Sequence, residues 1–391
     1  MTNHKILLAA PLMFSALVAN VANGEVASDP DPIEYRWPGL KLNSGWITAD
    51  IKLRAQLRLT STHIESGFTD TDEDSEAKVN RSRIKVGGML FTPQLDYYTE
   101  YDFPSDKLLD IRFSYQLKDL PVNIRIGQWK VPYNRERIDS SGKQQFIDRS
   151  IANKWFTLDR QRGIAFYGRV AEETGFDSSY NFAVTQGTGR NGEGTSDKPQ
   201  WLARWEWNFL KRATVFSQSN TSKNDAPIGS LTFGASESHG AYTAFSSAGG
   251  GQLAGFTAGS DDSYKISQYM QETYYQAKGL SWQQELHTKK VKDQRDGAQT
   301  IITGGYMQIG YFPAASWPSW PQPIELAIRY AKVTLSDSQN GSHNETSVVV
   351  NWFFSGHNNK ISADYSYGKD NTTFGKKENY HLMRLQWDFH L

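Results

Sequence analysis

The amino-acid sequence predicts an all-β protein, a transmembrane β-barrel of sixteen antiparallel strands. Three observations support this prediction. Apolar and polar residues alternate with a period of two along many segments, and these segments are long enough to cross a bilayer when tilted. Aromatic residues reach 13%, although hydrophobic residues in total make up only 38%. A barrel that is apolar outside and wet inside has such a composition, because its aromatic residues gather in girdles at the two membrane interfaces.

The clearest alternation lies between Ile47 and Leu59. Apolar residues occupy every odd position there, and the even positions hold Thr48, Asp50, Lys52, Arg54, Gln56 and Arg58. A strand separates such residues onto two faces, whereas a helix scatters them around its axis. A β-sandwich also alternates, so the length of the segments and the aromatic residues near their ends are what favour a membrane barrel.

The chain ends inside another alternating segment. Met383, Leu385, Trp387, Phe389 and Leu391 share one face up to the last residue. This pattern resembles the final-strand signal of bacterial outer-membrane proteins, most of which end in Phe where this chain has Leu. The C-terminus is therefore expected to be the last strand of the barrel.

The alternating segments number sixteen, and an even number is what a closed bacterial barrel of one chain requires. They lie near residues 46–60, 79–91, 94–103, 108–118, 122–130, 163–171, 177–187, 200–210, 212–220, 264–277, 280–291, 300–312, 323–335, 345–355, 359–369 and 379–391. The long linkers 61–78, 131–162 and 221–263 are expected to be external loops, and residues 210–211 a tight turn. Segment 221–263 is interpreted as one Gly/Ser-rich loop, although 230–233 and 241–245 could form strands.

The first 24 residues predict a signal peptide. Lys5 precedes an apolar run from 6 to 22, and small residues precede a cleavage site before Glu25. Residues 25–391 would then form a single transmembrane barrel domain. The alternative interpretation of the run is an N-terminal membrane anchor.

The charge of the chain is balanced, with 42 basic and 42 acidic residues, and there is no cysteine. Bulk charge therefore predicts no nucleic-acid partner, and any electrostatic selectivity must come from where the charges lie. The absence of cysteine rules out disulfides and thiolate metal sites. No cofactor is expected.

The stretch after the fifth predicted strand carries the most specific pattern. It reads Gly-Gln-Trp-Lys-Val-Pro from Gly127, Arg-Glu-Arg from Arg135, and Gln-Phe-Ile-Asp-Arg-Ser from Gln145. This stretch resembles the phosphate-selective porin O and P family. The resemblance implies an outer-membrane porin of a Gram-negative bacterium, a homotrimer, and a third external loop that folds inward to form a constriction. Residues 131–162 occupy the position of that loop.

The same resemblance implies passive diffusion of small anions, with phosphate or polyphosphate as candidate solutes. Charged side chains at a constriction set selectivity, and arginine suits phosphate because its planar fork binds oxyanions. The candidate pore-lining and anion-binding residues are Lys52, Arg54, Arg58, Arg83, Lys85, Arg125, Arg135, Arg137 and Arg149. The alternative is that these arginines pair with carboxylates such as Asp139, Asp148 and Asp159 and brace the structure.

The acidic linker 61–78 would repel anions at the mouth, so a general or cation-tolerant porin is the alternative function. Outer-membrane lipid and lipopolysaccharide are expected partners, and this linker is interpreted as a lipopolysaccharide contact bridged by divalent cations. The chain is not expected to be an enzyme, since it has no G-x-S-x-G motif and its histidines lack metal-motif spacing. A barrel lipase or protease would need His239 or His343 to meet a serine in space. A barrel plugged by its loops is a further alternative.

Overall fold

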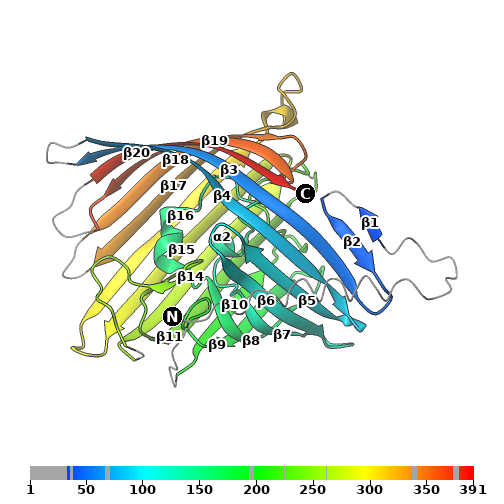
Figure 1. Ribbon diagram of the computed structural model, residues 1–391, viewed down its shortest axis with the longest axis horizontal. Helices are drawn as coiled ribbons and strands as arrows, with labels where there is room; N and C mark the ends of the chain where they lie inside the picture. Colours follow the sequence, from blue (N-terminus) through cyan, green and yellow to red (C-terminus); the bar gives the residue numbers. More distant parts are fainter. Residues whose placement is uncertain are drawn as a thin grey trace, which may run out of the picture.

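A closed antiparallel β-barrel makes up most of the chain (Figure 1). The computed structural model describes residues 33–35, 38–66, 71–192, 198–223, 225–260, 262–336, 341–372 and 378–391, so the expected signal peptide lies outside the described residues. Within these ranges, the strands of the ring are β3 (Thr48–Ser66), β4 (Thr71–Leu90), β5 (Thr92–Asp102), β6 (Lys107–Gln116), β7 (Asn123–Lys130), β8 (Arg160–Val170), β9 (Ser178–Thr185), β10 (Gln200–Trp207), β11 (Ile228–Gly240), β14 (Tyr264–Ala277), β15 (Leu280–Asp293), β16 (Gln299–Tyr311), β17 (Ile324–Ser336), β18 (Ser342–Phe353), β19 (Asn359–Asp370) and β20 (Glu378–His390). They number sixteen, so the predicted fold class is confirmed.

The last strand closes the ring on the first. β20 pairs with β3 from Glu378 opposite Ser66 to His390 opposite Arg54. The backbones of Leu53 and Leu391 exchange two hydrogen bonds of 2.9 Å. Two short strands, β1 (Ile33–Tyr35) and β2 (Leu40–Asn43), extend the sheet beside the start of β3. No helix among the described residues is both long enough and apolar enough to cross a membrane.

The alternation of the sequence separates side chains that face the lumen from side chains that face outward. Arg54 and Arg58 of β3 point inward and are 2% and 7% exposed, whereas Leu53, Leu57 and Leu59 are 41% to 54% exposed. This is the reverse of a soluble protein, and it suits a barrel whose outer face meets lipid. The alternation therefore predicted correctly which face of this strand is apolar.

The predicted ninth strand is wrong. Residues 212–220 contain no strand, and β11 takes that place in the ring between β10 and β14. Segment 221–263 is therefore not one loop. It contributes a wall strand and, beyond it, a small hairpin of β12 (Ala244–Ser246) and β13 (Gly249–Gly251). β11 was missed because its inward residues are small and its outward ones only partly apolar, so its sequence alternates weakly.

This correction changes the turns as well. The barrel has a loop end, where residues 131–159 connect β7 to β8, and a turn end, where β3 starts and β20 finishes. Residues 208–227 connect β10 to β11 at the turn end, so the tight turn expected at 210–211 is wrong. Part of this connection folds into the barrel, where the Tyr274 hydroxyl donates to the Ser217 carbonyl oxygen at 3.1 Å. The rule of short turns at one end is broken at this connection.

The linker 61–78 is also shorter than expected, because β3 continues to Ser66 and β4 starts at Thr71. Most of the acidic linker is thus a paired hairpin that extends the wall at the loop end. Its His63 imidazole lies 3.2 Å from the Glu73 carboxylate. Its predicted contact with lipopolysaccharide stays a prediction.

A hydrophobic core lies inside the barrel, under the inward-folded loops. Trp155 and Phe156 of α3 (Ile151–Phe156) pack with Leu253 against residues of β14 to β17. Inward side chains on those strands are buried, and they include Glu272 of β14 and Glu285 of β15. Inward cations of β4 and β6, such as Lys85 and Arg112, are only half-buried. The open part of the lumen therefore lies along β3 to β8.

Candidate pore constriction

Residues 131–159 form the loop that narrows the lumen. The short helix α2 (Arg135–Ile138) of this loop lies inside the ring of strands in Figure 1. Hydrogen bonds fasten the loop to the far wall: the Glu136 backbone N–H donates to Glu285 at 2.7 Å, and the Gln145 amide donates to Glu325 at 2.7 Å. The inward loop implied by the sequence is therefore present at residues 131–159.

Arg135 belongs to a buried charge cluster. Its guanidinium donates to Glu272 at 3.0 Å and to Glu206 at 3.2 Å. Arg204 donates to the same two carboxylates at 2.9 Å each. Two arginines thus balance two carboxylates, and Arg135 has no exposed surface. Such a cluster fixes the loop to the wall and leaves no guanidinium edge for a solute.

Arg137 and Arg83 are balanced in the same way. Arg137 donates to Asp159 at the end of the loop at 2.7 Å. Arg83 of β4 donates to Asp102 and to Glu100, each at 2.8 Å. All three carboxylates are buried. These arginines brace the wall and the loop.

Arg54 and Arg58 hold the closing seam between β3 and β20. Arg54 makes a two-pronged pair with Asp388 at 2.9 and 2.7 Å, and it also donates to Ser141 of the loop at 2.7 Å. Arg58 makes a second two-pronged pair with Asp148 of the loop at 2.8 and 3.0 Å. Loop, first strand and last strand are therefore locked together by charge-assisted hydrogen bonds.

The remaining predicted residues lie in other settings. Lys52 is 3.5 Å from Asp50 at the turn end, where both side chains are about half exposed. Arg125 stacks on the ring of Tyr167, with 4.5 Å from its guanidinium carbon to the ring centre. It also donates to the Tyr167 hydroxyl at 3.0 Å. Lys52, Arg125 and Arg135 thus lie in separate settings, whereas Lys85 lies within electrostatic range of Arg54 and Arg83.

Four half-buried cations lie where the loop faces the wall of β4 and β7, and none of them has an ion pair with a carboxylate among the described residues. They are Arg81, Lys85, Lys130 and Arg149. Arg81 donates to the Gln56 side-chain oxygen at 2.6 Å. Arg149 donates to the backbone carbonyls of Glu136 and Asp139 at 2.7 and 2.8 Å. Only Lys85 and Arg149 were among the predicted site residues.

These cations act on one another. Arg149 of the loop lies within electrostatic range of Arg81 on β4 and of Lys130 on β7. The repulsion therefore acts between the loop and both of these strands. Burial, with repulsion from Arg137 and Arg81, lowers the pKa of the Arg149 guanidinium well below its usual range. Positive charge is therefore crowded at this point, and an anion placed there would relieve the repulsion.

Two carboxylates lie near these cations. The buried Glu100, which is paired with Arg83, lies directly opposite Lys85, and the second carboxylate is the partly exposed Asp148. Asp148 has 37% of its side chain exposed and lies between Arg58 and Arg384, which donate to it at 2.8 and 2.9 Å. Although burial acts in the opposite direction, these two guanidiniums hold its pKa well below the usual range. Asp148 therefore stays ionised, and its single negative charge is smaller than the combined positive charge of Arg58 and Arg384.

A partial signal in the sequence marks Arg81 and Lys130, the two cations outside the predicted set of site residues. Arg81 precedes Arg83 and Lys85 at alternating positions of one strand face, and Lys130 lies within the motif that starts at Gly127. What the sequence could not show is which cations find a carboxylate, because the partners lie far away in the chain. Asp388, for example, is 334 positions from Arg54.

The family model of phosphate-selective porin O and P matches residues 51–389 of the chain. This chain belongs to that family. The match spans the whole ring of strands from β3 to β20. The porin has no match among curated proteins when they are searched by sequence.

Solved structures show the same fold at low sequence identity. An anion-selective porin from Comamonas acidovorans superposes with a TM-score of 0.59 at 10% identity, covering 88% of this chain and 100% of that chain. The trimer form of OmpT from Vibrio cholerae has a TM-score of 0.53 at 10% identity, covering 88% and 100%. The outer-membrane channel DcaP of Acinetobacter baumannii has a TM-score of 0.52 at 12% identity, covering 87% and 97%. The fold of the porin is thus that of outer-membrane channels.

His343, one of the two histidines considered for an enzyme, is engaged by other side chains. His343 lies 3.4 Å from Asp370, and its other ring nitrogen is 2.9 Å from the Tyr380 hydroxyl, so no serine completes a triad there. Ser217 does meet His357 at 2.9 Å, but the second ring nitrogen of His357 has no partner. Among the described residues, no group of three or more His, Asp or Glu side chains is arranged to hold a metal ion.

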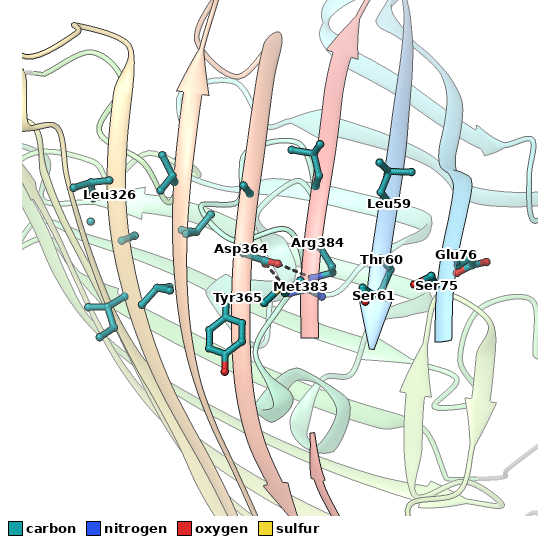
Figure 2. A pocket seen from close by; sticks show the side chains of 18 of the residues that line it. Leu59, Thr60, Ser61, Ser75, Glu76, Leu326, Asp364, Tyr365, Met383 and Arg384 are labelled. Carbon is teal, nitrogen blue, oxygen red and sulfur yellow. Dashed lines mark hydrogen bonds and ion pairs between the residues drawn. The ribbon is translucent and has the colours of Figure 1, made fainter. Parts of the chain in front are cut away.

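The porin also has a large hollow on its outer face. It has a volume of about 1110 Å³ and lies over β16 to β20, β3 and β4. Figure 2 shows its residues Leu59, Leu326, Tyr365 and Met383 on these neighbouring strands. The exposed positions of the hollow are mostly aliphatic. This hollow is separate from the pore.

Proposed function

We propose that this porin lets small anions diffuse across the outer membrane through a constriction lined by Arg81, Lys85, Lys130 and Arg149. The observation that carries the proposal is the contrast between these four half-buried cations without a carboxylate partner and the buried arginines that have one. A charge that is neutralised by a wall carboxylate adds little to selectivity. A charge that faces the lumen without a partner attracts counter-ions and repels ions of its own sign.

Phosphate is the solute we propose for this constriction. Arg81 and Arg149 offer planar forks that can bind two oxyanion oxygens, and the two lysines add positive charge without that directional demand. The family to which the chain belongs is described as phosphate-selective, and an anion-selective porin shares its fold. We also propose a homotrimer, because one of the similar structures is a trimer, and removal of residues 1–24 on export.

The test is a reversal potential across a planar bilayer in a potassium chloride gradient, followed by titration with phosphate. The wild-type channel should prefer chloride, and phosphate should reduce the chloride current. The double variant R81Q/K130Q should lose most of the anion preference, because two of the four lumen charges are gone. R149K should keep the chloride preference but bind phosphate more weakly, since it keeps the charge and loses the fork.

The matched control is K118Q/K211Q, which removes two exposed lysines from turns at the turn end. It should leave both measurements unchanged. A cation-selective wild-type channel would contradict the proposal and favour the cation-tolerant porin. Chloride selectivity without any effect of phosphate would keep the anion channel and reject phosphate as its solute.

A further inference from the structure

The outer hollow arises from the way residues of neighbouring strands line up in rows. Ala363 of β19 lies opposite Val350 on one side and Leu385 on the other, and Leu385 lies opposite Leu59. All four point outward with small or aliphatic side chains. Because outward residues of successive strands are direct neighbours, such a row forms a continuous strip across the wall.

Rows of rings border this strip on both sides. Toward the turn end, the row contains Trp352 and Trp387, with Ile361 between them. Toward the loop end, the bordering row contains Tyr367 of β19 and His381 of β20. They lie two residues nearer the loop end than Tyr365 and Met383. Small residues between two rows of larger rings leave a depression, and Ala363 lies at its floor.

The loop-end border continues into exposed lysines. In the next row, Lys332 of β17 lies opposite Asn344, and Asn344 lies opposite Lys369 of β19. Both lysines are exposed, and neither has an ion pair with a carboxylate among the described residues. The Lys369 ammonium lies 5.7 Å from the ring centre of Tyr367. The carboxylates of Glu65 and Glu73 lie away from these lysines, on β3 and β4, beside His381 and His63.

The depth of these rows fits the outer leaflet of the membrane. The aliphatic strip lies in the apolar band of the barrel, and Tyr330 and Tyr367 in its loop-end border row mark the interface. The lysines come directly after the tyrosines along the strands, at the level of lipid headgroups. Basic side chains at this level attract lipid phosphates.

We infer that the hollow binds a lipid that carries a phosphate in its headgroup, with acyl chains over Ala363 and the phosphate on Lys332 and Lys369. The apolar strip and the two unpaired ammonium groups form one continuous surface, and such a lipid complements both parts. A second protein chain packed here would cover the strip but would have to supply carboxylates for the lysines. The inference does not depend on which ions the pore selects.

The experiment uses the full-length porin in mild detergent and native mass spectrometry with two probes. Phosphatidic acid offers the phosphate, and diacylglycerol with the same acyl chains lacks it. The wild-type protein should retain phosphatidic acid in preference to diacylglycerol. In K332Q/K369Q this retention should fall by about thirtyfold, given roughly 1 kcal/mol for each of the two basic residues. In A363W, where the indole fills the floor, retention should fall for both probes.

Two matched variants serve as controls. K290Q/K292Q removes two outward lysines of β15, and A235W adds an indole on the outer face of β11. Both should retain phosphatidic acid as the wild type does. Equal retention in A363W and A235W would overturn the inference. So would a change of oligomeric state in A363W with unchanged lipid retention, because the hollow would then be a contact between copies of the chain.

Discussion

Arginine has two different roles in this channel, and the position of the nearest carboxylate separates them. Arg135 is fully buried between Glu272 and Glu206, whereas Arg81 is half-buried and donates to a glutamine oxygen. A buried charge is tolerated only when it is paired, so the first role is to hold the loop in place. An unpaired charge in contact with water is available to passing ions, which is the second role.

Removing Arg135 should destabilise the barrel without directly altering its selectivity. In R135Q, Glu272 and Glu206 stay buried and only Arg204 is left to balance them. Loss of one partner from a buried pair costs about 3–5 kcal/mol. The free energy of unfolding in urea, measured in detergent, checks this value.

The control for R135Q is K52Q, which breaks an exposed pair with Asp50. It should leave the unfolding curve nearly unchanged, because water screens an exposed pair. If R135Q unfolded at the same urea concentration as K52Q, the buried cluster would not be what anchors the loop.

Asp139 in the loop should make stability depend on pH. Neither of its carboxylate oxygens has a hydrogen-bond partner in the structure, and burial raises its pKa to about 7. Because this value lies above that of the unfolded chain, the protonated form favours the folded state. The contribution is complete below about pH 4 and is lost as pH rises to 7, on the order of 4 kcal/mol in total.

The variant D139N should remove this dependence, since an amide does not titrate. Wild type and D139N should therefore be similarly stable at pH 4, and D139N should be the more stable at pH 8. Urea unfolding at both pH values measures the difference, with D296N in an exposed loop as the control. A constant difference across this range would show that Asp139 is ionised in the folded protein at pH 4.

At the scale of elements, the connection 208–227 has a structural role that no pattern in its sequence predicts. It narrows the lumen from the turn end, while residues 131–159 narrow it from the loop end. The two segments meet, since the Gln218 backbone N–H donates to the Lys143 carbonyl at 3.1 Å and the Gln218 side chain accepts from the Gln145 N–H at 2.9 Å. The Ser219 hydroxyl then reaches Glu325 on the wall at 2.8 Å.

Replacing residues 214–219 by a glycine–serine segment of equal length should increase the single-channel conductance. The inward side chains would be lost, and so would the hydrogen bond that Arg135 donates to the Thr214 hydroxyl. A wider lumen carries more ions at the same voltage. The measurement is single-channel current in symmetrical potassium chloride.

The control is the same replacement at residues 316–320, an exposed part of another connection at the turn end. Its conductance should equal that of the wild type. Equal conductance in both variants would mean that the inward segment lies outside the path of the ions.

At the scale of the whole molecule, the barrel combines a charge of zero with a charged interior. Basic and acidic residues are equal in number, so any preference for anions comes from their placement. The interior also differs from one side to the other. The side of β14 to β17 is filled by loops and paired side chains, and the side of β3 to β8 keeps the half-buried cations. The ring has room for both, because sixteen strands enclose more space than wall side chains fill.

The sequence by itself determined the barrel and the apolar face of its strongly alternating strands. The predicted number of sixteen strands agrees with the structure, although one counted segment is not a strand and β11 takes its place. Strong alternation, as between Ile47 and Leu59, makes any other register expose apolar side chains to the lumen. The weakly alternating β11 did not give that signal, so its place was assigned wrongly to residues 212–220. Only the tertiary structure decided which arginines are neutralised, because Arg54 and Asp388 become neighbours when the last strand closes on the first. A pairing of charges across the whole chain depends on the closed ring, and no local pattern contains it.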